Sequence, residues 1–355
     1  MIGFLLSIVA VLVLVGIAVV GVWGLDLRIL FGVIVPYAAL ITFFAGMVYK
    51  VLDWSRSPVP FRIPTTCGQE KSLPWIKRNK IDNPASGGAV LLRMALEILT
   101  FRSLFRNMKL DYRQGPKIRY SSEKFLWLFA IMFHYAFLVV LIRHARFFLE
   151  PVPKLLAALE AVDGFLEFNL AAVGIGLPTV QLSGLVLLGG VSLLLLRRIV
   201  IPQVRYISLA ADWFPLFLIT AIGLTGILMR YVVRVDVVSI KELAMGLATF
   251  HPVVPQGVSA WFYVHLFLVC VLFAYFPFSK LMHLGGVFLS PTRNLANNSR
   301  SVRHVNPWNY PVKTHDYHEY EDDFREKMIG AGIPVERETA AEEPAAPAAE
   351  GKKEE

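Results

Sequence analysis

Four histidines lie inside two long apolar stretches of this 355-residue chain. His134 and His144 are ten residues apart, and His265 and His283 are eighteen residues apart. A polar ring is costly in lipid, so a histidine inside a membrane segment indicates a function. An imidazole ligates iron through one ring nitrogen while its other nitrogen bonds to the backbone. Two helices with two histidines each therefore predict two b-type haems, each between two imidazoles, which suits electron transfer.

The direction of the two segments predicts how the histidines pair. In antiparallel helices, His134 faces His283 and His144 faces His265. The axial separations are about 15 Å and about 27 Å, so tilt and a kink at Pro277 must absorb the difference. Eighteen residues make about five helical turns, which places His265 and His283 on one face of one helix.

Basic side chains flank both predicted pairs. Arg143 and Arg146 lie near one pair, and Lys280 and Arg119 near the other, as candidate contacts to haem propionates or to a quinone. A proton or metal transporter would need carboxylates beside the histidines. Residues 125–149 and 260–289 contain no Asp or Glu, which counts against transport. A non-redox scaffold whose histidines only join helices is the other alternative.

The rest of the composition indicates a membrane protein. Hydrophobic residues make up 55% of the chain, above the about 45–50% of soluble domains. Six apolar runs are long enough to cross a bilayer, and only helices satisfy the backbone in such runs. We therefore predict an all-α membrane protein with a six-helix transmembrane bundle. No basic residues precede the first run, so it is predicted to be a retained helix rather than a cleaved signal. The runs are 2–23, 27–52, 125–149, 178–196, 213–233 and 260–289.

Charge predicts the orientation. Residues 53–124 contain 14 Lys or Arg and 6 Asp or Glu, whereas residues 150–177 contain one Lys and four acids. Loops rich in Lys and Arg stay in the cytoplasm. Both termini are therefore predicted to be cytoplasmic in the inner (cytoplasmic) membrane, with His134 and His283 toward the cytoplasm.

Several segments outside the runs suggest partners. Residues 90–110 predict an amphipathic helix that lies at the membrane surface, docks a partner or packs within the loop. The aromatic and charged residues 291–335 predict a docking segment, and residues 336–355 a disordered tail. Within residues 291–335, the histidines of the run His315–His318 are predicted to be solvated or to contact a partner rather than to bind a metal. Only Cys67 and Cys270 are present, so any iron–sulfur cluster must belong to another subunit.

The spacing of the histidines resembles the dihaem cytochrome b subunit of respiratory nitrate reductase, the gamma type. Residues 24–290 would form its five-helix core and residues 1–23 an extra helix. The loop sequences SPVPFRIPTTCGQ (57–69) and SLPWIKRNKIDNP (72–84) resemble the membrane M subunit of the Dsr sulfite-reduction-associated complex. That family is related to the membrane subunit of heterodisulfide reductase.

The resemblance implies cofactors and partners. It implies two haems b on His134, His144, His265 and His283, menaquinone as substrate, and a cytoplasmic iron–sulfur subunit that resembles heterodisulfide reductase. Other membrane and periplasmic redox subunits would complete the complex, which would serve dissimilatory sulfur and sulfate metabolism. The resemblance implies no nucleic-acid partner. The chain would be an electron-transfer subunit of a quinone-linked oxidoreductase rather than a stand-alone enzyme.

Quinol oxidation is expected near His144 and His265, where Glu150, Arg143 and Arg146 are the nearest titratable or hydrogen-bonding groups. The loop 57–84 is expected to dock the iron–sulfur subunit. A nitrate reductase or heterodisulfide reductase complex is the alternative assignment, and the direction of electron flow stays open.

Overall fold

A computed structural model describes residues 2–57, 79–113, 117–165, 181–290, 293–297 and 314–336. The chain divides into two compact units, Met1–Val305 and Asn306–Glu355, which are described separately. Most of the loop 57–84, including Cys67, lies outside the described residues, as do His304 and the tail from residue 337. The side chain of Arg119 is also outside the described part.

Helices dominate the unit Met1–Val305, with one short β-hairpin. Its helices and strands are α1 (Ile2–Val19), α2 (Val35–Ser55), α3 (Gly87–Thr100), α4 (Arg102–Arg106), β1 (Met108–Arg113), β2 (Lys117–Ser122), α5 (Lys124–His144), α6 (Lys154–Phe165), α7 (Leu182–Val200), α8 (Pro202–Ile207), α9 (Ala210–Tyr231), α10 (Val237–Ala248), α11 (Ala260–Tyr275) and α12 (His283–Leu289). π-Helical turns at Val20–Gly24 and Leu30–Ile34 extend α1 and α2.

Within the described residues, six helical segments are long and apolar enough to cross a membrane, in agreement with the predicted number. They are Ile2–Gly24, Leu30–Ser55, Lys124–Phe148, Leu182–Val200, Ala210–Tyr231 and Ala260–Phe278. Their outward faces carry large apolar side chains such as Leu12 (64% exposed) and Ile41 (68% exposed). So much exposed apolar surface suits lipid rather than water, and the chain is a multi-pass membrane protein.

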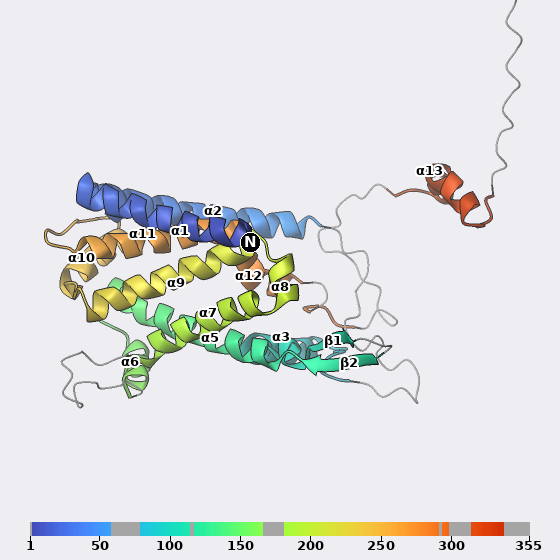
Figure 1. The fold of residues 1–355 in the computed structure, drawn as a ribbon, viewed down its shortest axis with the longest axis horizontal. Coiled ribbons are helices and arrows are strands. Elements are labelled where there is room, and N and C mark those ends of the chain that lie inside the picture. The colour runs from blue at the N-terminus through green and yellow to red at the C-terminus, as the bar shows by residue number, and fades with distance from the viewer. Residues whose placement is uncertain are drawn as a thin grey trace, which may run out of the picture. The chain divides into compact units, whose positions relative to one another are not determined.

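The spanning helices lie side by side in one bundle (Figure 1). α5 packs on α7, α7 on α9, α9 on α11 and α11 on α2, while α1 packs against α9 and α11. The N-terminus, α8, α12 and the hairpin β1–β2 lie at one end, and α6 and α10 at the other (Figure 1). Ser7 fixes the first span to the fifth by donating a hydrogen bond to the carbonyl of Ala210, at 3.1 Å. We call these ends the α8 end and the α10 end.

The sixth span is interrupted at Pro277, where the sequence predicts a kink. α11 ends at Tyr275, and 3₁₀ turns at Phe276–Phe278 and Lys280–Met282 flank an extended Ser279, so His265 and His283 do not lie on one continuous helix as predicted. Pro277 has no N–H to donate, so the chain leaves the α-helix at this point. Gly46 of α2 leaves room for the break, since a Cβ there would lie 2.7 Å from Cβ of Pro277. The interruption lies between His265 and His283, the segment in which the mismatch between the two histidine spacings must be absorbed.

The predicted helix over residues 90–110 is also wrong in its extent. It ends at Thr100 because Phe101 adopts the left-handed conformation (φ 49°, ψ 44°), and α4 follows. β1 then pairs with β2 in antiparallel register, with Met108 opposite Ser122. The alternating sequence MKLDYR favours a strand over a helix here. The hairpin is a small departure from the all-α prediction.

In the unit Asn306–Glu355 the described element is α13 (Tyr317–Gly330). Oδ1 of Asp316 caps this helix by accepting a hydrogen bond from the backbone N of Glu319, at 2.8 Å. His315 lies 3.3 Å from the Glu319 carboxylate. Across the described part of the chain, no group of three or more metal-binding side chains occurs.

Candidate cofactor site

The structure brings the four predicted histidines together as two facing pairs. His134 on α5 and His283 at the start of α12, the first pair, have ring centroids 5.9 Å apart and planes at 80°. His144 at the end of α5 and His265 on α11, the second pair, have centroids 6.4 Å apart and planes at 19°. These are the combinations that antiparallel helices predict, although the sixth helix is broken between its two histidines.

Each histidine uses Nδ1 for a hydrogen bond inside the protein. For three of them the partner is a backbone carbonyl oxygen one turn earlier: His134 with Ala130 (2.7 Å), His144 with Val140 (2.7 Å) and His283 with Lys280 (2.8 Å). A carbonyl only accepts, so Nδ1 carries the proton and Nε2 keeps a free lone pair. This tautomer is the one that an imidazole needs to bind a metal through Nε2.

The fourth histidine bonds to a side chain on a neighbouring helix. Nδ1 of His265 lies 2.9 Å from Oγ1 of Thr225 on α9. The same hydroxyl lies 2.9 Å from the carbonyl of Ala221 and 3.0 Å from that of Ile222. Because the single hydroxyl proton goes to a carbonyl, Thr225 accepts from Nδ1–H of His265. Sequence reasoning missed Thr225, whose only signal is a hydroxyl within an apolar span.

The geometry of both pairs fits a metal held between two imidazoles. A nitrogen about 2 Å from the metal on each side places the two ring centroids about 6 Å apart. The observed 5.9 Å and 6.4 Å match that separation. Two neutral imidazoles with free Nε2 lone pairs are the donor set of a b-type haem. The residues present therefore fit two haems, one per pair.

Aromatic rings surround the first pair. The ring of Phe101, at the junction of α3 and α4, meets His134 edge to face at 5.1 Å, and Phe133 meets it at 5.0 Å. The junction itself is fixed to α5. Trp127 donates to the carbonyl of Thr100 at 2.7 Å, and Tyr135 donates to that of Leu99 at 2.5 Å.

The predicted basic contacts of the second pair have carboxylate partners. Arg143 forms an ion pair with Asp163 on α6, which is buried and also accepts from Ser183 at 2.8 Å. Arg146 lies 3.2 Å from Glu160. Nε of Arg143 is buried and has no hydrogen-bond partner among the described residues, so this residue keeps one donor for a cofactor or quinone oxygen.

Near the first pair, the predicted contact Lys280 binds a carboxylate as well. Its Nζ lies 2.6 Å from Asp212 at the start of α9, and Arg198 lies 4.0 Å from the same carboxylate. Sequence reasoning missed Asp163 and Asp212, because both lie in other helices than the histidines.

A comparison with protein families identifies the fold. The family model of the nitrate reductase gamma subunit matches residues 96–304, a stretch that contains all four paired histidines. The chain belongs to this family. It is accordingly a cytochrome b-like membrane protein of the gamma type.

The relatives of this gamma-family chain are redox subunits. It is 46% identical over 289 residues to an Hdr-like menaquinol oxidoreductase cytochrome b-like subunit of Archaeoglobus fulgidus. The matched region covers 79% of this chain and 83% of the relative. A subunit of the same description from Archaeoglobus profundus is 40% identical, with 77% and 81% covered. The respiratory nitrate reductase 1 gamma chain of Escherichia coli is 35% identical over 127 residues, with 34% and 55% covered.

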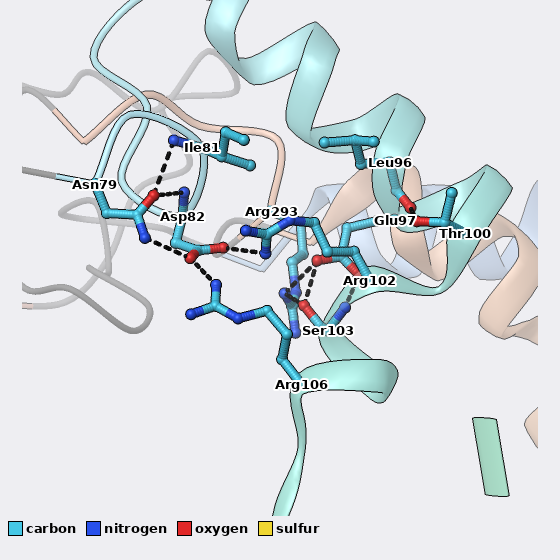
Figure 2. Close-up of polar contacts among 10 residues, drawn as sticks. All are labelled: Asn79, Ile81, Asp82, Leu96, Glu97, Thr100, Arg102, Ser103, Arg106 and Arg293. Atoms are coloured by element: carbon cyan, nitrogen blue, oxygen red, sulfur yellow. Dashed lines mark hydrogen bonds and ion pairs between the residues drawn. The ribbon is translucent and has the colours of Figure 1, made fainter. Parts of the chain in front are cut away.

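At the α8 end, the gamma-family chain has a polar cluster that joins the α3–α4 region to the segment after α12. Asp82 accepts from Arg102 at 2.7 Å, from Asn79 at 2.8 Å and from Arg106 (Figure 2). Glu97 of α3 lies 3.2 Å from Arg293, and Ser103 accepts from Arg293 at 2.6 Å. We call these residues the Asp82 cluster. The cluster therefore joins the segment that follows α12, the helix that His283 begins, to the α3–α4 junction, whose Phe101 packs on His134.

Proposed function

We propose that this chain is the haem b subunit of a quinone-linked complex in the inner (cytoplasmic) membrane. It would transfer electrons between menaquinol and a cytoplasmic iron–sulfur subunit that resembles heterodisulfide reductase. The observation that carries the proposal is the two facing imidazole pairs, each ring with Nδ1 bonded and Nε2 free. The two Archaeoglobus relatives, described as Hdr-like menaquinol oxidoreductase subunits, support the substrate and the type of partner.

Two haems b, when bound, supply two one-electron carriers at different depths of the membrane. The chain's own part is to hold and orient them. The carbonyls of Ala130, Val140 and Lys280 and the hydroxyl of Thr225 keep each imidazole in the tautomer that leaves Nε2 free. The rings of Phe101 and Phe133 pack edge to face against His134 and help to hold its ring.

The α10 end supplies groups for proton release from quinol near the second pair. Glu150 forms an ion pair with Lys241 on α10, and its carboxylate is 59% exposed. Its position between the second pair and solvent makes it the candidate group to relay a proton from quinol to water. The orphan Nε of Arg143 is a donor suited to a quinone oxygen.

The α8 end is proposed to face the cytoplasm, with both termini on that side. The 14 Lys or Arg of residues 53–124 and the basic residues of the α7–α8 region support this orientation. The iron–sulfur subunit would dock at this end, near the first pair. Further membrane and periplasmic redox subunits would complete the assembly, which we assign to dissimilatory sulfur metabolism of the Dsr type.

Optical spectroscopy tests the haem assignment. The full chain, expressed with ample haem, should show two low-spin haems b in reduced-minus-oxidised spectra and in pyridine haemochrome quantitation. His134→Ala and His265→Ala should each remove a different haem. His251→Ala is the matched control, because that ring bonds the carbonyl of Thr249 and belongs to neither pair. A colourless wild-type protein would refute the proposal.

Co-purification tests the partner. Pull-down of the tagged chain from its native membranes should recover an iron–sulfur subunit, and added menaquinol should reduce the haems. A molybdenum-containing nitrate reductase in its place would favour the alternative suggested by the likeness to the Escherichia coli gamma chain.

A further inference from the structure

The helix α3 has the reverse of the polarity expected for a helix in water. Between its glycine start and its last residue, Thr100, the exposed residues are apolar and follow one face: Leu91 (73% exposed), Leu92 (54%), Ala95, Ile98 (38%) and Leu99 (59%). Its charged residues face the protein, with Arg93 only 3% exposed and the side chain of Glu97 12% exposed. A soluble amphipathic helix would place these two groups the other way round.

The end of α3 reaches deep along a spanning helix. The carbonyl of Leu99 accepts from Tyr135, and the ring of Phe101 packs on His134. Tyr135 lies eleven residues after Lys124, where the third span begins. At 1.5 Å per residue, this is about 16 Å along the span, close to its middle.

The contacts of α4 bring the chain back to the end from which α3 came. Phe101 reverses the chain in its left-handed conformation, and Lys124 at the start of α5 lies 5.4 Å from the ring of Phe105. Figure 1 shows α3 beside α5, with β1 and β2 farther toward the α8 end. The 14 residues of α3 span about 21 Å, too short to cross a hydrocarbon core of about 30 Å.

The last carbonyls of α3 accept hydrogen bonds from side chains, as a helix end in a membrane requires. The final carbonyls of a helix have no partner within it, and in lipid each unpaired group costs several kcal/mol. Here Tyr135 and Trp127, both on a spanning helix, donate to the carbonyls of Leu99 and Thr100. A helix end exposed to water would not need these donors.

We propose that α3 is a re-entrant helix that enters the bilayer from the α8 end and returns through α4. Its face of Leu91, Leu92, Ala95, Ile98 and Leu99 contacts lipid acyl chains, while Arg93 and Glu97 point toward the protein. The Asp82 cluster, to which Glu97 belongs, holds the helix from the protein side (Figure 2). The proposal does not depend on what the histidine pairs bind.

Site-directed spin labelling tests the surroundings of this face. A nitroxide is attached to Leu92→Cys in a full chain that also carries Cys67→Ser and Cys270→Ser, reconstituted in phospholipid nanodiscs. Its collision rates with oxygen, which concentrates in lipid, and with a water-soluble nickel chelate are then compared. Leu128→Cys on α5 (43% exposed) is the lipid control. Glu326→Cys on the exposed face of α13 is the water control.

A several-fold excess of oxygen over nickel collisions at Leu92→Cys, equal to that at Leu128→Cys, is the expected result. The excess should increase from Leu91→Cys to Leu99→Cys, because the second lies deeper. Nickel access like that of Glu326→Cys would overturn the proposal. So would loss of both collision rates when the native partner subunits are added, because a protein rather than lipid would then cover the face.

Discussion

Replacing Thr225 by Val should change the second pair and leave the first unchanged. The hydroxyl of Thr225 accepts from Nδ1–H of His265 at 2.9 Å, and the substitution removes this acceptor while keeping the side-chain shape. A hydrogen bond from the ring N–H increases the basicity of the imidazole as a ligand. A more basic ligand stabilises the oxidised metal. Loss of the bond should therefore raise the reduction potential of the haem held by the second pair.

The size of the shift follows from the strength of the bond. A neutral hydrogen bond contributes about 1 kcal/mol net, of which we assign about 0.5–1 kcal/mol to the difference between the oxidation states. For one electron a tenfold change in equilibrium constant is about 59 mV, so this difference equals about 20–40 mV.

Spectroelectrochemical titration of the purified full chain in lipid measures both potentials. Thr220→Val is the matched control, since Thr220 lies on the same helix and donates only to the carbonyl of Leu216, at 2.7 Å. One component should move upward in Thr225→Val, and neither should move in Thr220→Val. A downward shift, a shift of the first pair, or an equal shift in the control would refute the role assigned to this hydroxyl.

Three further predictions concern the packing and geometry around the pairs. Asp163→Ala should lower the free energy of unfolding by about 3 kcal/mol, because it removes the carboxylate partner of Arg143, whose side chain is only 14% exposed. Glu160→Ala, at the more exposed pair with Arg146, should cost at most about 1 kcal/mol. Thermal unfolding in lipid measures both. Gly190→Ala should destabilise the protein by about 1–3 kcal/mol, because the new Cβ would lie 2.9 Å from the backbone N of Phe133. Gly189→Ala should be neutral, because a Cβ there meets nothing within 4 Å. Equal melting temperatures of the two variants would contradict the close packing of α5 and α7. The two haems should give distinct low-spin ferric EPR signals, because the ligand planes lie at 80° in the first pair and 19° in the second, and a single signal from both would contradict that difference.

The sequence predicted the helices and the histidine pairs well because both depend on local properties. Apolar runs of about 20 residues can only cross a membrane as helices, so six spans follow from composition. Two histidines on each of two antiparallel segments can pair at matching depths in one way only. The pairing therefore did not depend on the helix geometry between His265 and His283, where the sequence predicted a kink and the structure has a full break.

Other features depended on contacts between distant parts of the chain. Pro277 predicted a kink in the sixth span, but the size of the break depended on the space that Gly46 leaves on α2. The apolar residues of α3 fit either a surface helix or a docking helix until the bonds from Tyr135 and Trp127 fixed its depth.

By itself the sequence determined the number of spans, the alternation of their chain direction and which histidines can face each other, because hydrophobicity and chain direction are properties of each segment. Only the tertiary structure decided what the polar groups bind. Asp163 and Asp212 pair with cations of helices far away in the sequence, and Thr225 meets His265 across forty residues. A hydrogen bond or ion pair depends on distances of a few ångströms, and those distances are set when the helices pack.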